Sequence, residues 1–536
     1  MKVALVVLVS FLAATLSAQA PAPVTVQPDL RIESIGVVPQ GRPSQMVLGP
    51  DGRLYVTISD AADANGPSVV SFAYDATGPL ADPAVEASTG GAIGVAFGPV
   101  SLGPSGAPGS TLTTGMYLTD KPRDGISNLR VLTRGAQRPY GGAGGTNTVI
   151  VQNIPGGYHH ADQIIIKGNT LYVGIGVRTM DGVQGHPGRG NLRDNAYGGT
   201  ISQILDLRLV DGLTKDSAGF GLTGDISSNA VPDATNAGPY TSTALNKLIV
   251  HSSGTRNPFG LALDGNGDLW FTNNFSTTQA DGSFDGTIDP ATHWLKGFEP
   301  GDLSLPDPND RDLKNNPHDQ LFKARPRGDY GYNNINWRND ARKNNPEATS
   351  DAAVAAGFFD FATHGVRSTT FDNLVPPRGG FAEYDQSDPN RIVGLGPGSS
   401  ADGFVFYTAS TFPARYHGQA FITRWTGRTN DSTGHSVDYR DVIAVDVKTG
   451  IGRQVAKGFG NPLAALEDGH GNILIADYTT RIIYRILPAT SARNDRRRVV
   501  SRGYAGTYVS LITSSAMRSC AASRSGARGP AKYGLP

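Results

Sequence analysis

The chain has 536 residues, which is long enough for a large buried core and for more than one ordinary domain. Its 47 basic and 47 acidic residues cancel, and only 18% of residues are charged, so the overall charge predicts no nucleic acid and no anionic membrane surface as partner. The single cysteine, Cys520, rules out an internal disulfide framework.

The N-terminus has the pattern of a secretory signal peptide. Met1-Lys2 is followed by an apolar run from Val3 to Leu16 and by the small residues Ser17-Ala18-Gln19-Ala20. We therefore expect residues 1–20 to be removed, residues 21–28 to form a Pro-rich linker, and the mature protein to be secreted or periplasmic. No later stretch has the length and apolarity of an integral membrane segment.

The C-terminus differs in charge from the rest of the chain. Residues 489–536 contain nine basic residues and one acidic residue, which leaves 38 basic and 46 acidic residues before them, a net charge of −8. The Ser/Arg/Gly/Ala mixture of this segment has too few apolar residues to build a core, so we expect a disordered basic tail at 489–536.

Apolar hairpins recur between residues 29 and 488. Each unit is a short apolar strand, a turn that often contains Asp-Gly, and a second apolar strand. Copies occur at 43–58, 93–120, 161–176, 259–273, 403–425 and 463–477. This repeat predicts an all-β fold, a six-bladed β-propeller of four-stranded antiparallel blades. We expect the strand at 29–38 to complete the last blade beside 481–486, which removes an exposed edge.

Four motifs follow one another among these hairpins. They are His159-His160 before a strand, Gly254-Thr255-Arg256-Asn257-Pro258-Phe259-Gly260-Leu261, Gly328-Asp329-Tyr330-Gly331-Tyr332, and Ser399-Ser400-Ala401-Asp402-Gly403. With the hairpins, they make the chain resemble the glucose/sorbosone dehydrogenase family from roughly Pro43 to Ile486. Members of that family are soluble six-bladed propellers that bind pyrroloquinoline quinone (PQQ) and calcium. The resemblance implies an exported oxidoreductase that oxidises the C1 hydroxyl or aldehyde hydrate of a sugar and passes electrons to an external acceptor.

The resemblance implies that His159 is the general base, with His160 as its catalytic neighbour. In the family, a histidine that heads one blade takes the hydroxyl proton while hydride passes to the quinone. Histidine suits this role because its pKa lies near neutrality. A loop imidazole that is hydrogen-bonded to backbone is the structural alternative.

Arg256 and Asn257 match the family's pair of quinone-binding residues. A guanidinium suits planar oxyanions, although Arg-Asn-Pro also occurs as a simple turn. We expect Arg424, or alternatively Arg428, to supply positive charge at this site.

The stretch Asn316-Pro317-His318-Asp319-Gln320 resembles the family's calcium-binding segment. The resemblance implies calcium ligands at Asn316, Pro317, Asp319 and Gln320, which offer the oxygen atoms that hard cations prefer. Acidic loops are also common as merely solvated surface.

Three positions depart from the family pattern. Tyr158 stands where catalytic members have an acid, Gln320 where calcium binding uses Glu, and Thr408 where a lysine pairs with the cofactor. Loss of a carboxylate weakens cation binding, and loss of a lysine removes a counter-charge for an anionic quinone. Two other hypotheses therefore stay open, a calcium-dependent hydrolase of the lactonase type and a non-catalytic propeller that binds glycan or protein.

Overall fold

The computed structural model describes residues 22–60, 65–101, 112–123, 126–135, 138–155, 159–177, 198–209, 248–252, 255–274, 288–289, 294–295, 318–324, 326, 394–397, 399–426, 429–430, 436–437, 439–448 and 451–489. The predicted signal peptide and nearly all of the predicted basic tail lie outside this set. The chain divides into a unit at Met1–Ala489, which holds every described strand, and a second unit at Thr490–Pro536.

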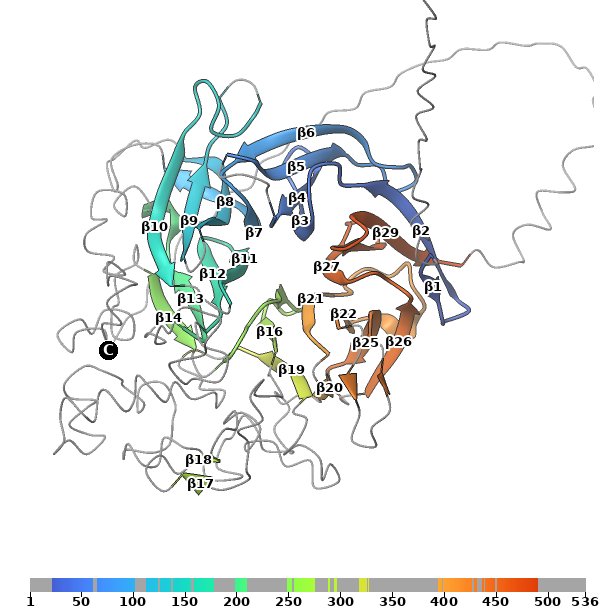
Figure 1. The fold of residues 1–536 in the computed structure, drawn as a ribbon. Coiled ribbons are helices and arrows are strands. Elements are labelled where there is room, and N and C mark those ends of the chain that lie inside the picture. Colours follow the sequence, from blue (N-terminus) through green and yellow to red (C-terminus); the bar gives the residue numbers. More distant parts are fainter. Residues whose placement is uncertain are drawn as a thin grey trace, which may run out of the picture. The chain divides into compact units, whose positions relative to one another are not determined.

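Six antiparallel sheets form the blades of a propeller (Figure 1). In chain order, the strands of blades 1 and 2 are β3 (Pro43–Leu48), β4 (Leu54–Ile58), β5 (Pro67–Ala73), β6 (Ala81–Ser88), β7 (Ala92–Ser101), β8 (Leu112–Arg123), β9 (Ile126–Leu132) and β10 (Asn147–Pro155). Those of blades 3 and 4 are β11 (Ala161–Lys167), β12 (Thr170–Ile175), β13 (Thr200–Ile204), β14 (Leu248–Ser252), β15 (Leu261–Leu263), β16 (Leu269–Asn273), β19 (His318–Lys323) and β20 (Gly394–Pro397).

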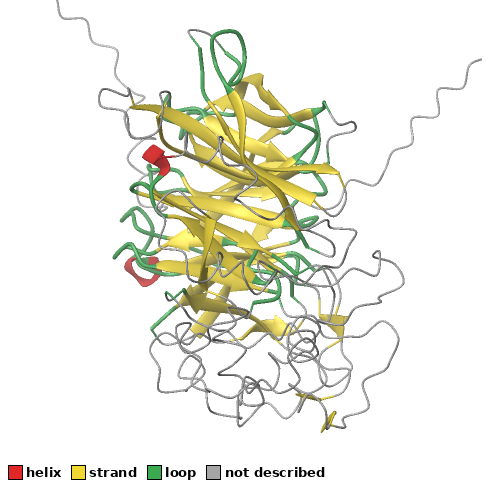
Figure 2. Cartoon of the chain, turned by 90° about the vertical axis from the view of Figure 1, so that its left-hand side faces the viewer, coloured by secondary structure: helices red, strands yellow, loops and turns green. Residues whose placement is uncertain are grey.

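Blades 5 and 6 complete the ring. They contain β21 (Ala401–Phe406), β22 (Ala420–Arg424), β25 (Asp441–Asp446), β26 (Ile451–Lys457), β27 (Pro462–Glu467), β28 (Ile473–Asp477) and β29 (Ile482–Pro488). Two further pairs, β17–β18 (Ile288–Asp289, Trp294–Leu295) and β23–β24 (Thr429–Asn430, Ser436–Val437), stand apart from the blades. The only helices among the described residues are single 3-10 turns at Leu207–Leu209 and Ala414–Tyr416 (Figure 2). The predicted all-β six-bladed propeller is thus confirmed.

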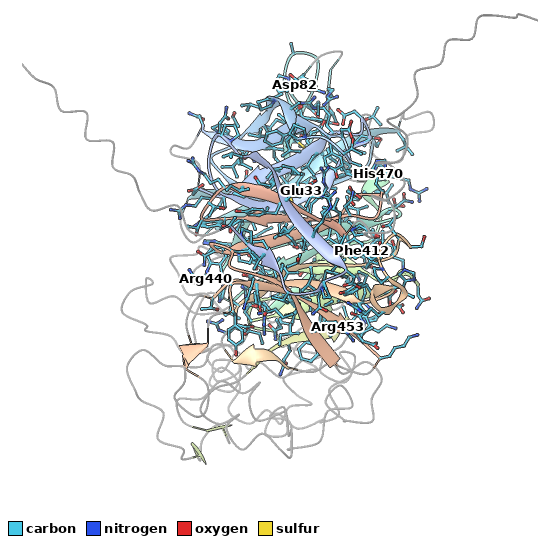
Figure 3. All side chains as sticks on the ribbon, turned by 90° about the vertical axis from the view of Figure 1, so that its right-hand side faces the viewer. Glu33, Asp82, Phe412, Arg440, Arg453 and His470 are labelled. Carbon is cyan, nitrogen blue, oxygen red and sulfur yellow. The ribbon has the colours of Figure 1, made fainter. Side chains whose placement is uncertain are left out.

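The N-terminal strands close the ring. Strand β2 (Leu30–Val37) pairs antiparallel with β29 from Leu30↔Pro488 to Val37↔Ile482, as the sequence predicted, and becomes the outer strand of blade 6. Glu33, which is labelled on β2 in Figure 3, accepts a 2.9 Å hydrogen bond from Nε of Arg485 on β29. Strand β1 (Val24–Thr25) lies in the segment predicted as a linker and pairs with β26, so blade 5 has five strands rather than the predicted four.

The hydrophobic core is divided among the gaps between blades. Each of six apolar clusters joins two neighbouring blades, and together they run all the way round the ring. Between blades 4 and 5, for example, Trp270 of β16 packs with Phe406 of β21 at a ring-centroid distance of 5.6 Å. Because strand side chains alternate between two sheet faces, each blade contributes one face to each of two clusters. Burial between blades therefore holds the ring together.

The second strand of each blade carries a sequence repeat that links it to the next blade. Three apolar residues are followed by Thr, Gly or Ala, as in Leu54-Tyr55-Val56-Thr57 and Leu269-Trp270-Phe271-Thr272. The Thr57 hydroxyl accepts the N–H of Gln45 in its own blade (2.7 Å) and donates to the carbonyl of Ile93 in the next blade (2.9 Å). Thr119 and Thr272 make the equivalent pair of bonds.

The first strand begins with a β-bulge in five of the six blades, all except blade 4. In blade 3, Ala161 pairs with Ile175 and Ile164 pairs with Val173, so Asp162 and Gln163 together face one residue of β12. The same shift occurs in blades 1, 2, 5 and 6. Bulges re-aim side chains. The first bulge residues are equivalent positions around the ring. In blade 4 the equivalent residue is Phe259, because the N–H of the next residue, Gly260, donates to Thr272 as that of Gln45 donates to Thr57. In blade order these residues are Ser44, Ile93, Asp162, Phe259, Asp402 and Leu463; we call them the ring residues.

The ring residues differ in chemistry between alternate blades. Ile93, Phe259 and Leu463 come from blades 2, 4 and 6 but pack in one apolar cluster, so they must approach the axis of the propeller. The positions from blades 1, 3 and 5 are polar instead, with Ser44, Asp162 and Asp402, and all three are buried. The axis is therefore lined by apolar and polar side chains in turn.

Candidate functional site

Polar side chains gather at one end of the ring, where β11 and β21 begin and β12 and β16 end. The two predicted catalytic histidines lie on the loop that enters β11. The His159 N–H donates to the carbonyl of Val177 (3.0 Å), and the His160 carbonyl accepts the N–H of Gly176 (2.9 Å). These backbone bonds fix the histidine loop against the end of β12, and both side chains are partly exposed.

His159 and Asn257 meet at Gly176. A Cβ atom added to Gly176 would lie 2.3 Å from the Cβ of His159 and 2.8 Å from Oδ1 of Asn257. Both distances are too short for a real side chain, so glycine is the residue that lets the two side chains approach. The structure thus brings the predicted base of blade 3 and the predicted cofactor ligand of blade 4 together.

Arg256 and Asn257 form a turn that is hydrogen-bonded to the end of β16 in blade 4. Oδ1 of Asn273, the last residue of β16, accepts the N–H groups of Arg256 (3.0 Å) and Asn257 (3.1 Å). The Arg256 guanidinium donates to the carbonyl of Asn274 (3.0 Å) and is almost fully buried. The backbone of Arg-Asn-Pro is therefore a turn, as the structural alternative had it, and quinone binding by the two side chains stays a prediction.

Several buried amide atoms in this cluster lack hydrogen-bond partners among the residues that the structure describes. They are Oδ1 of Asn257, Nδ2 of Asn273, Oδ1 of Asn274, and both Oε1 and Nε2 of Gln320. Gln320 lies directly across from Asn273 in the β16–β19 pair. A buried polar atom without a partner costs about 1–3 kcal/mol, so a group of them is typical of a site that receives a ligand.

A second copy of the turn, in blade 6, shows what the same motif does as a purely structural element. Gly460-Asn461-Pro462-Leu463 corresponds to Arg256-Asn257-Pro258-Phe259. Here Asn461 donates to the carbonyl of Trp425 (2.9 Å) and accepts from the hydroxyl of Thr479 (2.5 Å). The equivalent amide in blade 4, that of Asn257, has an oxygen without a partner among the described residues.

Asp319 of blade 4 and Asp402 of blade 5 add two buried carboxyl groups where these blades meet. Asp319 accepts from the Ser399 hydroxyl (2.9 Å) and the Ala401 N–H (3.1 Å), and Asp402 accepts from Nδ2 of Asn274 (2.7 Å). Burial raises the pKa of Asp319 to about 7, although these hydrogen bonds and the charge of Arg256 oppose the shift. Burial also raises the pKa of Asp402 well above its usual range.

The predicted calcium ligands fall only partly within the described residues. Asp319 and Gln320 lie on β19 in this cluster, whereas Asn316 and Pro317 lie outside the described set. Within the described ranges, no three His, Cys, Asp or Glu side chains are grouped so that they could hold a metal ion. A cation at this end of the propeller would therefore need amide or carbonyl oxygens as well as carboxylates.

Arg424 and Thr408 are not brought to the cluster. Nε and Nη2 of Arg424 donate to the two oxygens of Asp441 (2.8 and 2.6 Å), and Nη1 donates to the carbonyl of Leu395 (2.9 Å). Thr408 follows the far end of β21 and donates through its hydroxyl to Glu467 (2.6 Å). The position compared with the family's lysine thus lies at the opposite end of the strand from Asp402.

An aromatic pair borders the polar cluster on blades 5 and 6. The Trp425 N–H donates to the carbonyl of Ser400 (2.9 Å), two residues before Asp402. Its ring lies 4.7 Å from that of Tyr478, and the Arg42 guanidinium lies 5.1 Å from the Tyr478 ring centre. Both rings are partly exposed. Sequence reasoning missed this pair, although each aromatic residue directly follows the last residue of a second strand in the hairpin repeat.

Asp162, Asn273 and Asn274 were also missed. An alignment of the hairpin repeats could have found the first of these, because Asp162 and Asp402 occupy the position that is Ile93 or Leu463 in other blades.

Among the described residues no helix has the length and apolarity to cross a membrane.

Comparison with known proteins gives structural likenesses only. No family model matches the chain, and no curated protein sequence matches it. One solved structure that it resembles is a calcium structure of Trichoderma reesei Carbohydrate-Active Enzymes Family AA12, with 14% identity, a TM-score of 0.48, and coverage of 89% of this chain and 100% of that chain. A second is the PQQ-bound aldose sugar dehydrogenase from Streptomyces coelicolor, with 13% identity, a TM-score of 0.43, and coverage of 87% and 100%. A third is the apo form of the soluble aldose sugar dehydrogenase from Escherichia coli, with 11% identity, a TM-score of 0.44, and coverage of 86% and 100%. With TM-scores below 0.5, these likenesses assign no activity to this chain.

Proposed function

We propose that this protein is a PQQ-dependent dehydrogenase that oxidises the C1 hydroxyl or aldehyde hydrate of a sugar. One observation carries the proposal. His159 and Asn257, which belong to different motifs and different blades, approach each other at Gly176, and the oxygen of Asn257 has no partner among the described residues. A base beside an unsatisfied binding group is the arrangement that proton abstraction from a bound substrate requires.

The residues at this end fit the proposed cofactors. Arg256 supplies a buried positive charge, and Nδ2 of Asn273 and Nε2 of Gln320 are donors without acceptors among the described residues, which suits an anionic quinone rich in oxygens. Asp319 and Oε1 of Gln320 suit calcium, whose charge would offset the buried carboxylate. When bound, the quinone would accept the hydride from C1.

The chain's own residues would supply binding and proton transfer. His159 takes the proton of the C1 hydroxyl, and the backbone bonds of His159 and His160 to the end of β12 keep the imidazole loop in place. Trp425 and Tyr478 offer an aromatic surface for the apolar face of a sugar ring. Because the Asn274 carbonyl holds the Arg256 guanidinium, little reorganisation is needed when a ligand binds.

Reconstitution tests this proposal. Purified protein with PQQ and calcium is expected to reduce an electron-accepting dye when aldoses are added, and His159→Ala should lower kcat by about 100-fold or more while PQQ still binds. Arg424→Gln is the matched control, because its ion pair with Asp441 is not joined to the cluster, and it should keep quinone affinity. Absence of cofactor-dependent dye reduction across aldoses and sugar aldehydes would refute the proposal.

A calcium-dependent hydrolase of the lactonase type is the second candidate. The observation that favours it is the density of buried acids, with Asp162, Asp319 and Asp402 all at one end of the ring. Lactone hydrolysis by quinone-free, calcium-loaded protein would support it, and the absence of such hydrolysis would remove it.

We also propose that the protein is secreted or periplasmic and hands electrons to an external acceptor. The apolar N-terminal run and its small-residue exit support export. N-terminal sequencing of protein recovered outside the cytoplasm is expected to begin near residue 21. An N-terminus at Met1 in that fraction would count against the signal peptide.

A further inference from the structure

We propose that Asp162 and Asp402, together with the side-chain oxygen of Asn274, bind a hard divalent cation such as Ca²⁺ on the axis of the propeller. This site is distinct from the calcium segment predicted at residues 316–320. It goes beyond the proposed function and does not depend on it.

The first argument is position. Asp162 and Asp402 are both ring residues, at the bulge that opens the first strand of blades 3 and 5. Their equivalents Ile93, Phe259 and Leu463 meet in one apolar cluster across the axis. The backbone carbonyls of both residues already accept hydrogen bonds. The Thr119 hydroxyl donates to the carbonyl of Asp162 (2.8 Å), and the Thr272 hydroxyl donates to that of Asp402 (2.7 Å). The carboxyl group of Asp402 accepts hydrogen bonds from Asn274 (2.7 Å) and Ser400 (3.3 Å), and Oδ2 of Asp162 has no partner among the described residues.

The second argument is charge. Both carboxyl groups are 3% exposed, and although blade 4 lies between their blades, the charge of Asp402 reaches Asp162. Burial and that charge together raise the pKa of Asp162 well above its usual range, and no positive side chain among the described residues counters them. Buried carboxylates are paired, neutralised or bound to a metal. A divalent cation between these two would neutralise both.

The third argument is the presence of oxygen atoms without donors beside the pair. Oδ2 of Asp162 accepts no hydrogen bond from the described residues, and it is fully enclosed. Asn274 donates through Nδ2 to Asp402 (2.7 Å), which places its own Oδ1 beside that carboxyl, and this Oδ1 is also buried without a partner in the described set. Asn274 is 6% exposed. Two carboxylates and an amide oxygen are the donor atoms that Ca²⁺ selects.

The ring also shows that a fold of this kind does not need acids at these positions. Apolar side chains fill the same position in three blades, and Ser44 fills it in blade 1 with hydrogen bonds to the carbonyls of Ala92 (3.0 Å) and Ile93 (3.2 Å). Asp402 accepts hydrogen bonds from Asn274 (2.7 Å) and from the Ser400 hydroxyl (3.3 Å), whereas Oδ2 of Asp162 has no partner among the described residues. Burial of this pair of acids without a cation therefore costs stability.

Calcium binding by the full chain, without quinone, tests the site. Metal-stripped protein is titrated with Ca²⁺ by calorimetry, and bound ions are counted after equilibrium dialysis. We expect Asp162→Asn and Asp402→Asn each to lose one bound ion per chain or to weaken that ion at least 100-fold. Asp319→Asn should keep this ion and affect only the separate predicted segment, and Asp75→Asn, an exposed acid, should change nothing.

A stability measurement keeps the test valid if a variant folds poorly. In EDTA, Asp162→Asn should melt at or above the temperature of the wild type, because it removes a buried carboxyl, but Ca²⁺ should raise the melting temperature of the wild type alone. The proposal is overturned if stripped wild-type protein binds no Ca²⁺ at millimolar concentration. It is equally overturned if both variants keep the wild-type number of ions, whether or not quinone-dependent activity is found.

Discussion

Asn273 and Asp477 occupy the same position in blades 4 and 6, the last residue of the second strand, and each accepts two N–H groups of the turn that precedes the first strand. Asp477 accepts those of Gly460 (2.5 Å) and Asn461 (3.1 Å), and also those of Thr479 and Thr480. Among the described residues, Asn273 accepts only those of Arg256 and Asn257. The same turn motif therefore occurs twice. In blade 6 its Asp and Asn side chains are hydrogen-bonded, whereas in blade 4 Oδ1 of Asn257 and Nδ2 of Asn273 have no partner among the described residues.

The two asparagines of these turns should respond oppositely to removal. Asn461→Ala loses bonds to Trp425 and Thr479 and is expected to lower the free energy of unfolding by about 1–2 kcal/mol. Asn257→Ala removes an oxygen without a partner among the described residues, so it should cost clearly less stability but weaken PQQ binding at least tenfold. Urea unfolding and calorimetric titration measure the two effects. An equal loss of stability in both variants would make Asn257 a structural residue.

Gly176→Ala is expected to damage the site through sterics alone. The new Cβ would lie 2.3 Å from the Cβ of His159, so the histidine loop must shift. A displacement of about 1 Å near reacting groups costs on the order of 100-fold in rate, and the crowding should cost about 1–3 kcal/mol of stability. Gly265→Ala is the matched control, since nothing lies within 4 Å of its added Cβ. Steady-state dye reduction and thermal melts compare the two, and unchanged kcat in Gly176→Ala would contradict the site.

Trp425→Ala should raise KM for sugars by about tenfold with a smaller change in kcat, because it removes an aromatic surface and leaves His159 and Arg256 in place. Trp425→Phe keeps an aromatic face beside Tyr478 and should stay within about threefold of the wild type. The measurement is initial rate against aldose concentration at saturating quinone. If Trp425→Ala leaves KM unchanged, the sugar does not lie on this wall.

His251 should make stability fall in mild acid. Burial lowers its pKa from 6.5 to about 4, and its ring lies against Tyr172 at 5.4 Å. Between those values the unfolded chain binds the extra proton, so this stabilising contribution is complete above about pH 6.5 and is lost as pH falls towards 4, on the order of 3 kcal/mol in all. Urea unfolding at pH 4.5 and 7 should show a smaller difference for His251→Asn than for the wild type. His470→Asn, at an exposed site, is the control.

The fold could be predicted from the sequence because the features that determine each hairpin lie within a short stretch of the chain. Each hairpin carries its own apolar alternation and turn, and the closing pair 29–38 with 481–486 is readable from two apolar strands that have no other partner. Blade 5 gained a fifth strand, β1, because a two-residue strand such as Val24–Thr25 has no periodicity to detect.

The candidate site could be predicted from the sequence only in part, because it depends on contacts between residues of different blades and strands. Arg424 was expected at the cofactor, but its bidentate partner Asp441 sits opposite it on the neighbouring strand β25, and only the register reveals that pair. The approach of His159 to Asn257 likewise depends on the space at Gly176. Asp162 and Asp402 are equivalent positions of the hairpin repeat, but only the structure shows that these positions are buried and approach the axis.

The closing blade has a consequence for how the chain can assemble. Glu33 and Arg485, which join its two outer strands, are 452 residues apart in sequence. During synthesis, β2 must therefore stay unpaired until almost the entire ring exists, and an unpaired strand invites pairing with other chains. A circularly permuted chain that begins at Pro462 and links Pro488 to Leu30 would build this blade from consecutive residues, and should refold with less aggregation than the natural order.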